Sequence, residues 1–309
     1  MTVANGKAKA QTVRLFFTMF LLLSAISGCA TNKSPAAHNK TDTQKKVKHA
    51  LSIDPTYKTG SRAVDAASND SQPETELNSA VNMQNLIQEA ANMAESSREY
   101  RSAATHWAEL YEYDPRDKNV VFRLARSLRH IGFLTEAEKV LIDALAYWRD
   151  DPLLSLERAR VLTAQGQAEN AITIIEFLEE EHPNDPGILM IKGIALDRNG
   201  DHKAAQMTYD KALVAGGASA QLLNNYALSH AVDGNLAKAE KLLRRAIISR
   251  GSTIQTQQNL AMILALGNKT AEAERILLNS SPPKEVARAI EFYSSLSSNL
   301  QDIWDTISH

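Results

Sequence analysis

The sequence predicts an all-α protein, a superhelical solenoid of repeated helix pairs, and two observations carry that prediction. Good helix formers dominate the 309-residue chain, while aromatic residues make up 6% and glycine occupies only 13 positions. Residues of the same size class also recur every 34 positions. The single cysteine excludes a disulfide within the chain and a cysteine-based zinc site. The formal charge of −2 disfavours electrostatic binding of nucleic acid.

Four sets of positions carry the 34-residue period. The first holds only alanine: Ala103, Ala137, Ala171, Ala205, Ala239 and Ala273. The second holds glycine and then one asparagine: Gly132, Gly166, Gly200, Gly234 and Asn268. The third holds only small residues: Ala91, Ala125, Ala159, Gly193, Ala227 and Ala261. The fourth holds bulky residues: Trp107, Leu141, Ile175, Tyr209, Leu243 and Leu277.

Each set has a physical role in a pair of antiparallel helices. The alanines and the small residues allow the two helices to cross closely, and the bulky residue fills the space between repeats. The glycine adopts the left-handed backbone conformation that ends the first helix, and asparagine is the next-best residue for that conformation. Pro115 and Pro183 mark the end of the second helix, and Gly217 and Gly251 take that place in later units.

These spacings resemble the tetratricopeptide repeat (TPR). The best-matching unit holds Leu189, Gly193, Leu196, Gly200, Ala205, Tyr209 and Ala212. The predicted units are 84–117, 118–151, 152–185, 186–219, 220–253 and 254–287, within an array over 81–287. The first and last units are degenerate, with Arg98 at the glycine position and Ser280 at an alanine position, as expected for the ends of a solenoid.

A C-terminal capping helix is predicted over 288–309. Apolar residues at helical spacing start just before it and are expected to cover the last repeat: Val286, Ile290, Tyr293, Leu296, Leu300 and Trp304.

The N-terminus is predicted to be a lipoprotein signal peptide over 1–28. A basic start precedes the apolar run 15–26, which is too short to span a bilayer. The next residues, Ile26-Ser27-Gly28-Cys29, resemble the bacterial lipobox. That resemblance implies cleavage between Gly28 and Cys29, acylation of Cys29, and, with Ala30 following, an outer-membrane anchor facing the periplasm. The alternative is an ordinary secretory signal, or an uncleaved anchor, with an incidental cysteine.

The range 29–80 is predicted to be the lipidated cysteine followed by a flexible polar linker. It has one aromatic residue, Tyr57, and few branched aliphatic residues, so it cannot bury enough apolar surface to order itself. A solvated tether is the first interpretation, and a docking segment for a partner is the alternative.

The motifs of common enzymes are missing from the sequence. It holds no HExxH, P-loop or GxSxG. We interpret His182 as part of a solvated helix end and His202 as a polar residue of a turn. The sequence therefore predicts a protein that is not an enzyme, with no metal, no cofactor and no small-molecule substrate.

A TPR array offers a groove lined by the first helix of each unit. The residues expected there are Phe122, Arg126, Arg129, Arg160, Asn224, Asn225, Gln258 and Asn259. Arginines at one end and amides further along favour an acidic or carboxylate-bearing peptide. The alternative is that the arginines only keep the array soluble, because they lie near Glu136, Glu138 and Glu157. The paired lysines of chaperone-binding TPR proteins are not reproduced.

The segment 222–276 resembles the last two repeats of the TadD-like TPR lipoproteins of the tight-adherence (Tad/Flp) pilus system. The residues that carry the resemblance are Asn224-Asn225-Tyr226-Ala227-Leu228 and Gln258-Asn259-Leu260-Ala261. A short helix after Pro282-Pro283 is also similar. The resemblance implies a periplasmic scaffold that assists assembly or localisation of the pilus secretin. Two alternatives stay open: a lipoprotein of another envelope machine, such as a type IVa pilotin, and an adaptor for a peptidoglycan hydrolase or protease.

Overall fold

The computed structural model describes the backbone of residues 73–308 and the side chains of residues 82–296. The predicted signal peptide, Cys29 and most of the predicted linker lie outside these residues. The described part contains thirteen helices and no strand, which confirms the all-α prediction. The helices are α3 (Pro73–Ser96), α4 (Tyr100–Tyr113), α5 (Lys118–His130), α6 (Leu134–Leu145), α7 (Pro152–Ala164), α8 (Ala168–Glu181), α9 (Pro186–Asn199), α10 (His202–Gly216), α11 (Ala220–Val232), α12 (Leu236–Ile248), α13 (Ile254–Leu266), α14 (Thr270–Leu278) and α15 (Pro283–Ser308).

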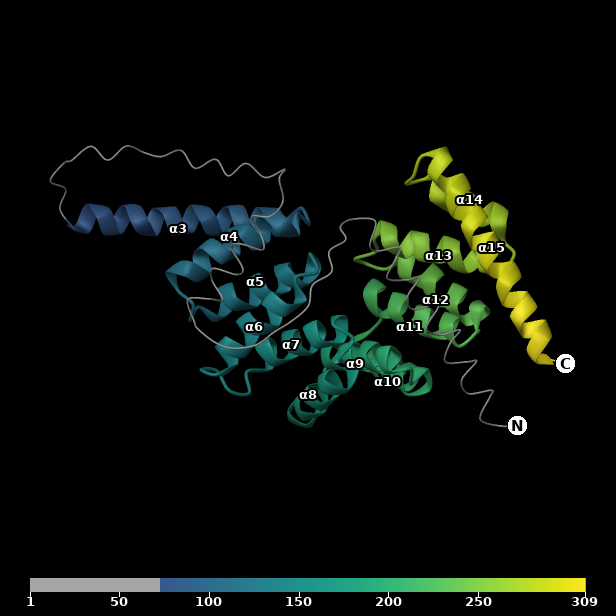
Figure 1. The fold of residues 1–309 in the computed structure, drawn as a ribbon, viewed down its shortest axis with the longest axis horizontal. Coiled ribbons are helices and arrows are strands. Elements are labelled where there is room, and N and C mark those ends of the chain that lie inside the picture. The colour runs from purple at the N-terminus through teal and green to yellow at the C-terminus, as the bar shows by residue number, and fades with distance from the viewer. Residues whose placement is uncertain (1–72, 309) are drawn as a thin grey trace. The chain divides into compact units, whose positions relative to one another are not determined.

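The described helices form two compact units, and the division falls inside α8 (Figure 1). The N-terminal unit holds α3 to α7 and the first half of α8, and the C-terminal unit holds the rest. Apart from α8, consecutive helices within each unit pack on one another. First helices also contact first helices: α5 with α7 in one unit, and α9 with α11 and α11 with α13 in the other. The first helices therefore make the inner layer of each unit, with the second helices outside them.

The turn inside each repeat is left-handed, as the glycine positions predict. Gly132, Gly166, Gly200 and Gly234 have φ between 81° and 86°, and Asn268 has φ of 61°. Arg98, the degenerate member of the set, adopts the same conformation with φ of 61°. In every turn the N–H of the next residue donates to a carbonyl five residues back, as Phe133 does to Leu128 at 2.9 Å. The prediction of left-handed helix ends is confirmed.

The first helices α5, α7, α9, α11 and α13 share an N-cap that the sequence interpretation missed. Asp117, Asp151, Asp185, Ser219 and Thr253 stand 34 residues apart, each directly before a first helix. Each side chain accepts a hydrogen bond from a backbone N–H two or three residues on. These bonds satisfy donors that the helix itself leaves unpaired.

The small and bulky positions meet inside the helix pairs. Trp107 and Tyr209 are fully buried, as are the alanines of both alanine-containing sets. Gly193 on α9 faces the Tyr209 ring on α10 so closely that a Cβ at this position would overlap the ring. The predicted close crossing is therefore confirmed for this pair, and glycine is the residue that permits it.

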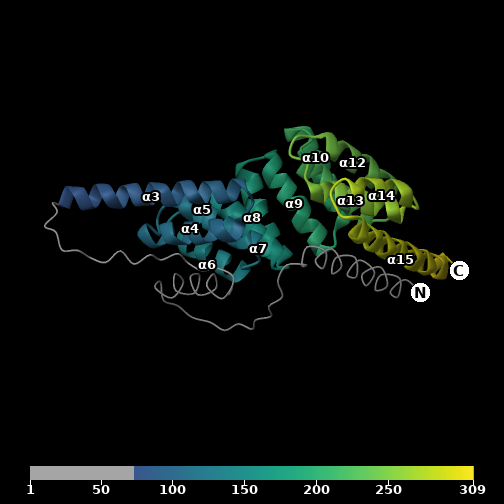
Figure 2. The ribbon, with the colours of Figure 1, turned by 90° about the horizontal axis from the view of Figure 1, so that it is seen from above.

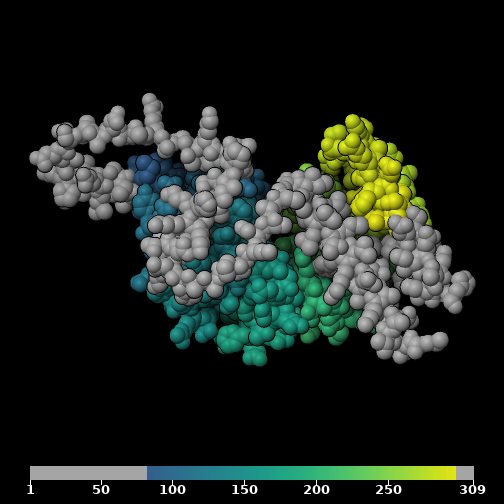
Figure 3. Space-filling view, in the orientation of Figure 1, coloured from purple at the N-terminus to yellow at the C-terminus, as the bar shows by residue number. Residues whose placement is uncertain are grey.

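The last helix covers the end of the array. α15 packs on α13 and α14, with Val286 and Tyr293 buried and Ile290 and Leu296 partly buried. The predicted cap is confirmed for these four residues, whereas the side chains of Leu300 and Trp304 lie outside the described set. In Figure 3, α14 and the described part of α15 form the yellow end of the C-terminal unit.

The two end helices differ in length from the predicted ranges. α3 begins at Pro73, inside the predicted linker, and α15 begins at Pro283, before the predicted cap. The domain ranges themselves stay predictions. Across the described residues, none of the helices combines the length and apolar character needed to cross a membrane.

Candidate functional site

The predicted groove residues lie on first helices, four in each unit. Phe122, Arg126 and Arg129 are on α5, and Arg160 is on α7. In the C-terminal unit, Asn224 and Asn225 are on α11, and Gln258 and Asn259 are on α13. The structure thus describes them as two candidate surfaces, one on the inner layer of each unit.

Two of the groove arginines are held by a buried carboxylate. Glu157 on α7 is 1% exposed and accepts a hydrogen bond from Arg129 Nε at 2.7 Å and from Arg160 Nη1 at 3.0 Å. The bond to Arg129 also ties α5 to α7. A carboxylate buried this deeply needs its cationic partners, so Arg129 and Arg160 stabilise the fold, and Glu157 balances one of their two charges.

Arg126 is placed differently. Its side chain is half-buried and makes no hydrogen bond or ion pair with any described residue. Phe122, one helical turn earlier, is also half-buried. Among the described residues, the inner surface of the N-terminal unit therefore offers the Arg126 guanidinium group without a partner, one helical turn from an aromatic ring.

His130 is the last residue of α5, one helical turn after Arg126. Its ring stacks on the Tyr100 ring, with centroids 3.9 Å apart and planes 8° from parallel. Partial burial of the ring, and then the charges of Arg129 and Arg126, lower the pKa of His130 from 6.5 to about 4. His130 is therefore neutral at pH 7 and adds no charge to the surface.

Amide side chains form the candidate surface of the C-terminal unit. Asn259 is 3% exposed, donates to Asn224 Oδ1 at 2.8 Å and accepts from Gln255 Nε2 at 3.1 Å. Asn259 thus joins α13 to α11 and orients the Asn224 amide. Asn225 and Gln258 are half-buried and make no side-chain hydrogen bond with described residues. Their amides can donate to and accept from an extended backbone.

A buried polar cluster in the C-terminal unit escaped the sequence interpretation. Asp197 on α9 accepts hydrogen bonds from Tyr209 Oη at 3.0 Å and Ser229 Oγ at 2.7 Å. His202 Nδ1 lies 2.9 Å from the same carboxylate, which can only accept, so Nδ1 carries the proton. The interpretation of His202 as a solvated polar residue of a turn is wrong, because this residue is only 9% exposed.

The position of Asp197 in the sequence could have revealed part of this cluster. Asp197 follows Gly193 by one helical turn and so faces Tyr209 in the same way. Its partners come from α10 and α11, which only the packing of successive helices brings together. Because the whole cluster is buried and Ser229 bonds to the carboxylate, its role is to hold the repeats together.

Metal binding has no support among the described residues. No three histidine, cysteine or carboxylate side chains there are grouped as metal ligands. His182 lies exposed just beyond α8, and Glu179, three residues earlier, pairs with Lys192.

Paired helices with left-handed turns, a 34-residue period and small residues at the crossings define an α-solenoid. The family model for the tetratricopeptide repeat matches residues 89–141, 122–186 and 191–253, which together make up just over half of the chain. The chain belongs to the tetratricopeptide repeat family. This fold is generally a non-enzymatic scaffold for protein–protein interaction.

The chain is similar to several solved structures. A thermophilic TPR protein of Thermus thermophilus matches with a TM-score of 0.54 and 14% identity, over 59% of this chain and 98% of that chain. A TPR protein from Parabacteroides merdae ATCC 43184 matches with a TM-score of 0.48 and 18% identity, over 69% and 90%. MamA from Desulfovibrio magneticus RS-1 matches with a TM-score of 0.43 and 18% identity, over 57% and 97%. A search of curated proteins finds no significant match.

Proposed function

We propose that the protein is a lipid-anchored scaffold on the periplasmic side of the outer membrane, which assists assembly or localisation of the secretin of a Tad/Flp pilus apparatus. The observation that carries the anchor is that Cys29, the only cysteine, directly follows Ile26-Ser27-Gly28. Membership of the TPR family supports the scaffold role. The resemblance of 222–276 to TadD-like lipoproteins supports the choice of the pilus system.

The partner on this proposal is an extended acidic or carboxylate-bearing segment. In the N-terminal unit the carboxylate binds Arg126, because Glu157 already occupies Arg129 and Arg160. In the C-terminal unit the amides of Asn225 and Gln258 bind extended backbone. The amide pair Asn224 and Asn259 serves as the fixed support next to them.

The anchor is tested by replacing the acylated residue. Cys29→Ala is expected to abolish acyl labelling and to release the protein from membranes. Ala30→Asp is the matched control, because it leaves the cysteine in place and changes only the position that is expected to sort the lipoprotein between membranes. Persistent acyl labelling of Cys29→Ala would contradict the lipobox interpretation.

The pilus role is tested by deleting the protein and measuring secretin multimers and surface pili. Loss of multimers, restored by the wild-type chain, supports the proposal. Normal multimers with intact pili exclude it. A defect confined to type IVa pili, or to recruitment of a peptidoglycan hydrolase or protease, also excludes it and favours the corresponding alternative.

A further inference from the structure

The outer layer of the C-terminal unit exposes isolated apolar side chains. The second helices α10, α12 and α14 follow one another along one side of this unit (Figures 1 and 2). Val214 on α10 is 89% exposed and Ile248 on α12 is 84% exposed. These two residues stand 34 apart, at the same place in successive repeats, so both project from the same face. Met207 on α10 is 66% exposed.

Cations share the faces of α10 and α12 that carry these apolar side chains. Lys211, Lys241 and Arg245 are exposed, and their side chains make no hydrogen bond or ion pair with any described residue. Lys241, Arg245 and Ile248 follow one another at spacings of four and three on α12, so they share one stripe of the helix. A shallow depression of about 510 Å³ opens beside this stripe, and Lys241, Arg245 and Ile248 are among its lining residues.

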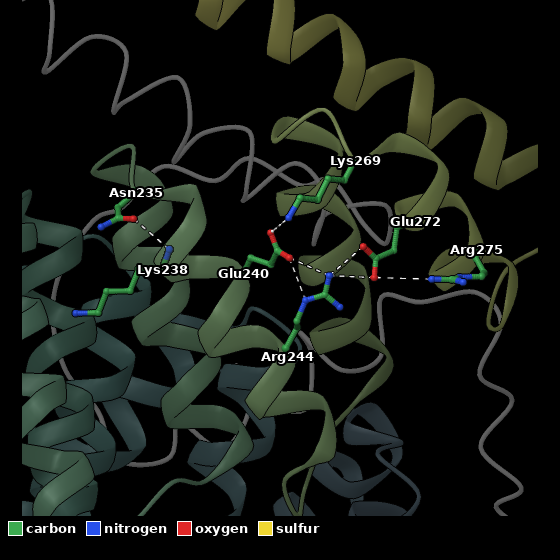
Figure 4. Close-up of polar contacts among 7 residues, drawn as sticks. All are labelled: Asn235, Lys238, Glu240, Arg244, Lys269, Glu272 and Arg275. Carbon is green, nitrogen blue, oxygen red and sulfur yellow. Dashed lines mark hydrogen bonds and ion pairs between the residues drawn. The ribbon is translucent and has the colours of Figure 1, made fainter.

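The carboxylates near this stripe are already neutralised by an ion-pair network (Figure 4). Glu240 accepts from Lys269 Nζ at 2.7 Å and from Arg244 Nη2 at 2.8 Å. Arg244 Nη2 also donates to both carboxylate oxygens of Glu272 at 2.9 Å. Because both carboxylates have cationic partners within the network, the charges of Lys241 and Arg245 on α12 are left uncompensated.

We infer that this outer face, defined by Met207, Lys211, Val214, Lys241, Arg245 and Ile248, lies on a bilayer that contains anionic phospholipids. The cations pair with lipid phosphates, and the apolar side chains enter the boundary between headgroups and acyl chains. Lysine and arginine suit that place because long aliphatic stems let their charged ends reach the phosphates.

A lipid surface fits this face better than a protein partner does. The exposed apolar side chains project singly between cations, whereas the core of a protein interface is depleted of charge. The contact goes beyond the proposed anchor at Cys29, because it fixes the orientation of the C-terminal unit. With the second helices on the bilayer, the amides of α11 and α13 face away from it.

The experiment places one environment-sensitive dye on the full chain, through an introduced cysteine at Val214→Cys or Ile248→Cys. Gln221→Cys, exposed at the start of α11, is the control site, and the parent chain reports any dye taken up by Cys29. On phosphatidylcholine vesicles that contain phosphatidylglycerol, both outer-face dyes are expected to shift to the blue and to resist an aqueous quencher. The Gln221→Cys dye is expected to stay quenchable.

Charge reversal separates this face from a general charge effect. Lys241→Glu with Arg245→Glu should lower the protected fraction of the Val214→Cys dye roughly tenfold. The matched control, Lys284→Glu with Arg288→Glu, makes the same charge change at the same spacing on the exposed surface of α15 and should leave protection unchanged. Equal loss in both pairs overturns the inference.

Vesicle flotation, measured on the same samples, reports attachment through the N-terminus independently. Quenchable dyes at both outer-face sites on floated vesicles overturn the inference, leave the Cys29 proposal intact and point to an acidic protein as the partner of this face. Protected dyes together with absent acyl labelling support the outer face and reject the anchor.

Discussion

The hydroxyl of Ser229 on α11 donates a hydrogen bond to the buried carboxylate of Asp197 on α9, 2.7 Å away. This bond joins two successive repeats, and Tyr209 and His202 from the intervening helix hold the same carboxylate. A buried carboxylate that receives three hydrogen bonds stabilises the fold only while all its partners remain. The cluster is therefore sensitive to the loss of any member.

Replacing Asp197 by alanine should lower the free energy of unfolding by about 3 kcal/mol, because it leaves three buried polar groups without their acceptor. Ser229→Ala removes one donor and should cost about 1 kcal/mol. Urea denaturation followed by circular dichroism measures both changes. Ser249→Ala is the control, because the hydroxyl of this partly exposed serine donates to the Arg245 carbonyl and bonds to no other described residue. A Ser229→Ala effect no larger than that of the control would contradict a role for the cluster.

Gly193→Ala should destabilise the protein by about 1–2 kcal/mol, because overlap with the Tyr209 ring outweighs the better helix propensity of alanine. In a Tyr209→Leu background the same substitution should become neutral or stabilising. Other repeats pair alanine with leucine at these two positions, as in Ala125 and Leu141. A double-mutant cycle in urea measures the coupling. Additive effects would show that the two side chains do not compete for space.

Glu157→Gln should lower the free energy of unfolding by about 2 kcal/mol, because Arg129 and Arg160 lose the one carboxylate to which both are paired. Both arginines are partly exposed to water, which limits the loss. Glu138→Gln is the control, since its ion pair with Arg158 is 3.8 Å long and more exposed. Thermal unfolding of the two variants compares them, and equal melting temperatures would reject the buried pair as a stabilising feature.

Stability should fall as the pH drops from about 6.5 to about 4, in part through His130. The unfolded chain takes up a proton on this histidine below its ordinary pKa, while the folded chain resists protonation until the lowered pKa is reached. The unfolded state therefore binds more protons in this window. His130→Gln should flatten the pH dependence of the unfolding midpoint. An unchanged slope would show that His130 titrates normally in the folded protein.

Arg126→Glu should weaken capture of the partner segment without lowering the melting temperature, because Arg126 has no protein partner among the described residues. Co-purification of the proposed secretin partner measures capture. Arg149→Glu, an equal charge change at an exposed loop residue, is the control. Arg160→Glu is unsuitable for this purpose, since it places a second carboxylate beside Glu157. Equal capture by both variants would favour the alternative that Arg126 only keeps the array soluble.

The sequence predicted the fold in detail because the repeat multiplies weak signals. One glycine says little about a turn, but Gly132 and its equivalents predicted the left-handed ends that the structure has, including Asn268. The missed N-caps, such as Asp151 and Ser219, differ in residue type, so the period is visible only when aspartate, serine and threonine are treated as one class of acceptor.

The candidate surfaces were less predictable, because side-chain pairing depends on distances between helices. The sequence placed Arg129 and Arg160 beside Glu157 but left open whether they bind a ligand or stay with the carboxylate. The structure shows that both arginines bond to Glu157, which is 1% exposed. Ligand binding by these arginines stays a prediction. Arg126 and Gln258 remain able to bind a partner, because neither side chain pairs with another described residue. Only the structure reveals this.

The N-caps at 34-residue intervals also limit how such a chain can change in length. From α5 onward, each first helix begins directly after its own N-cap residue at the boundary between repeats, as α9 begins after Asp185. Duplicating or deleting one whole repeat leaves every cap directly before its helix and every turn residue directly after it. An insertion of any other length inside a helix pair separates a helix from its N-cap residue or from the turn residue that ends it. The array can therefore be lengthened or shortened by evolution, or by an engineer, in whole repeats.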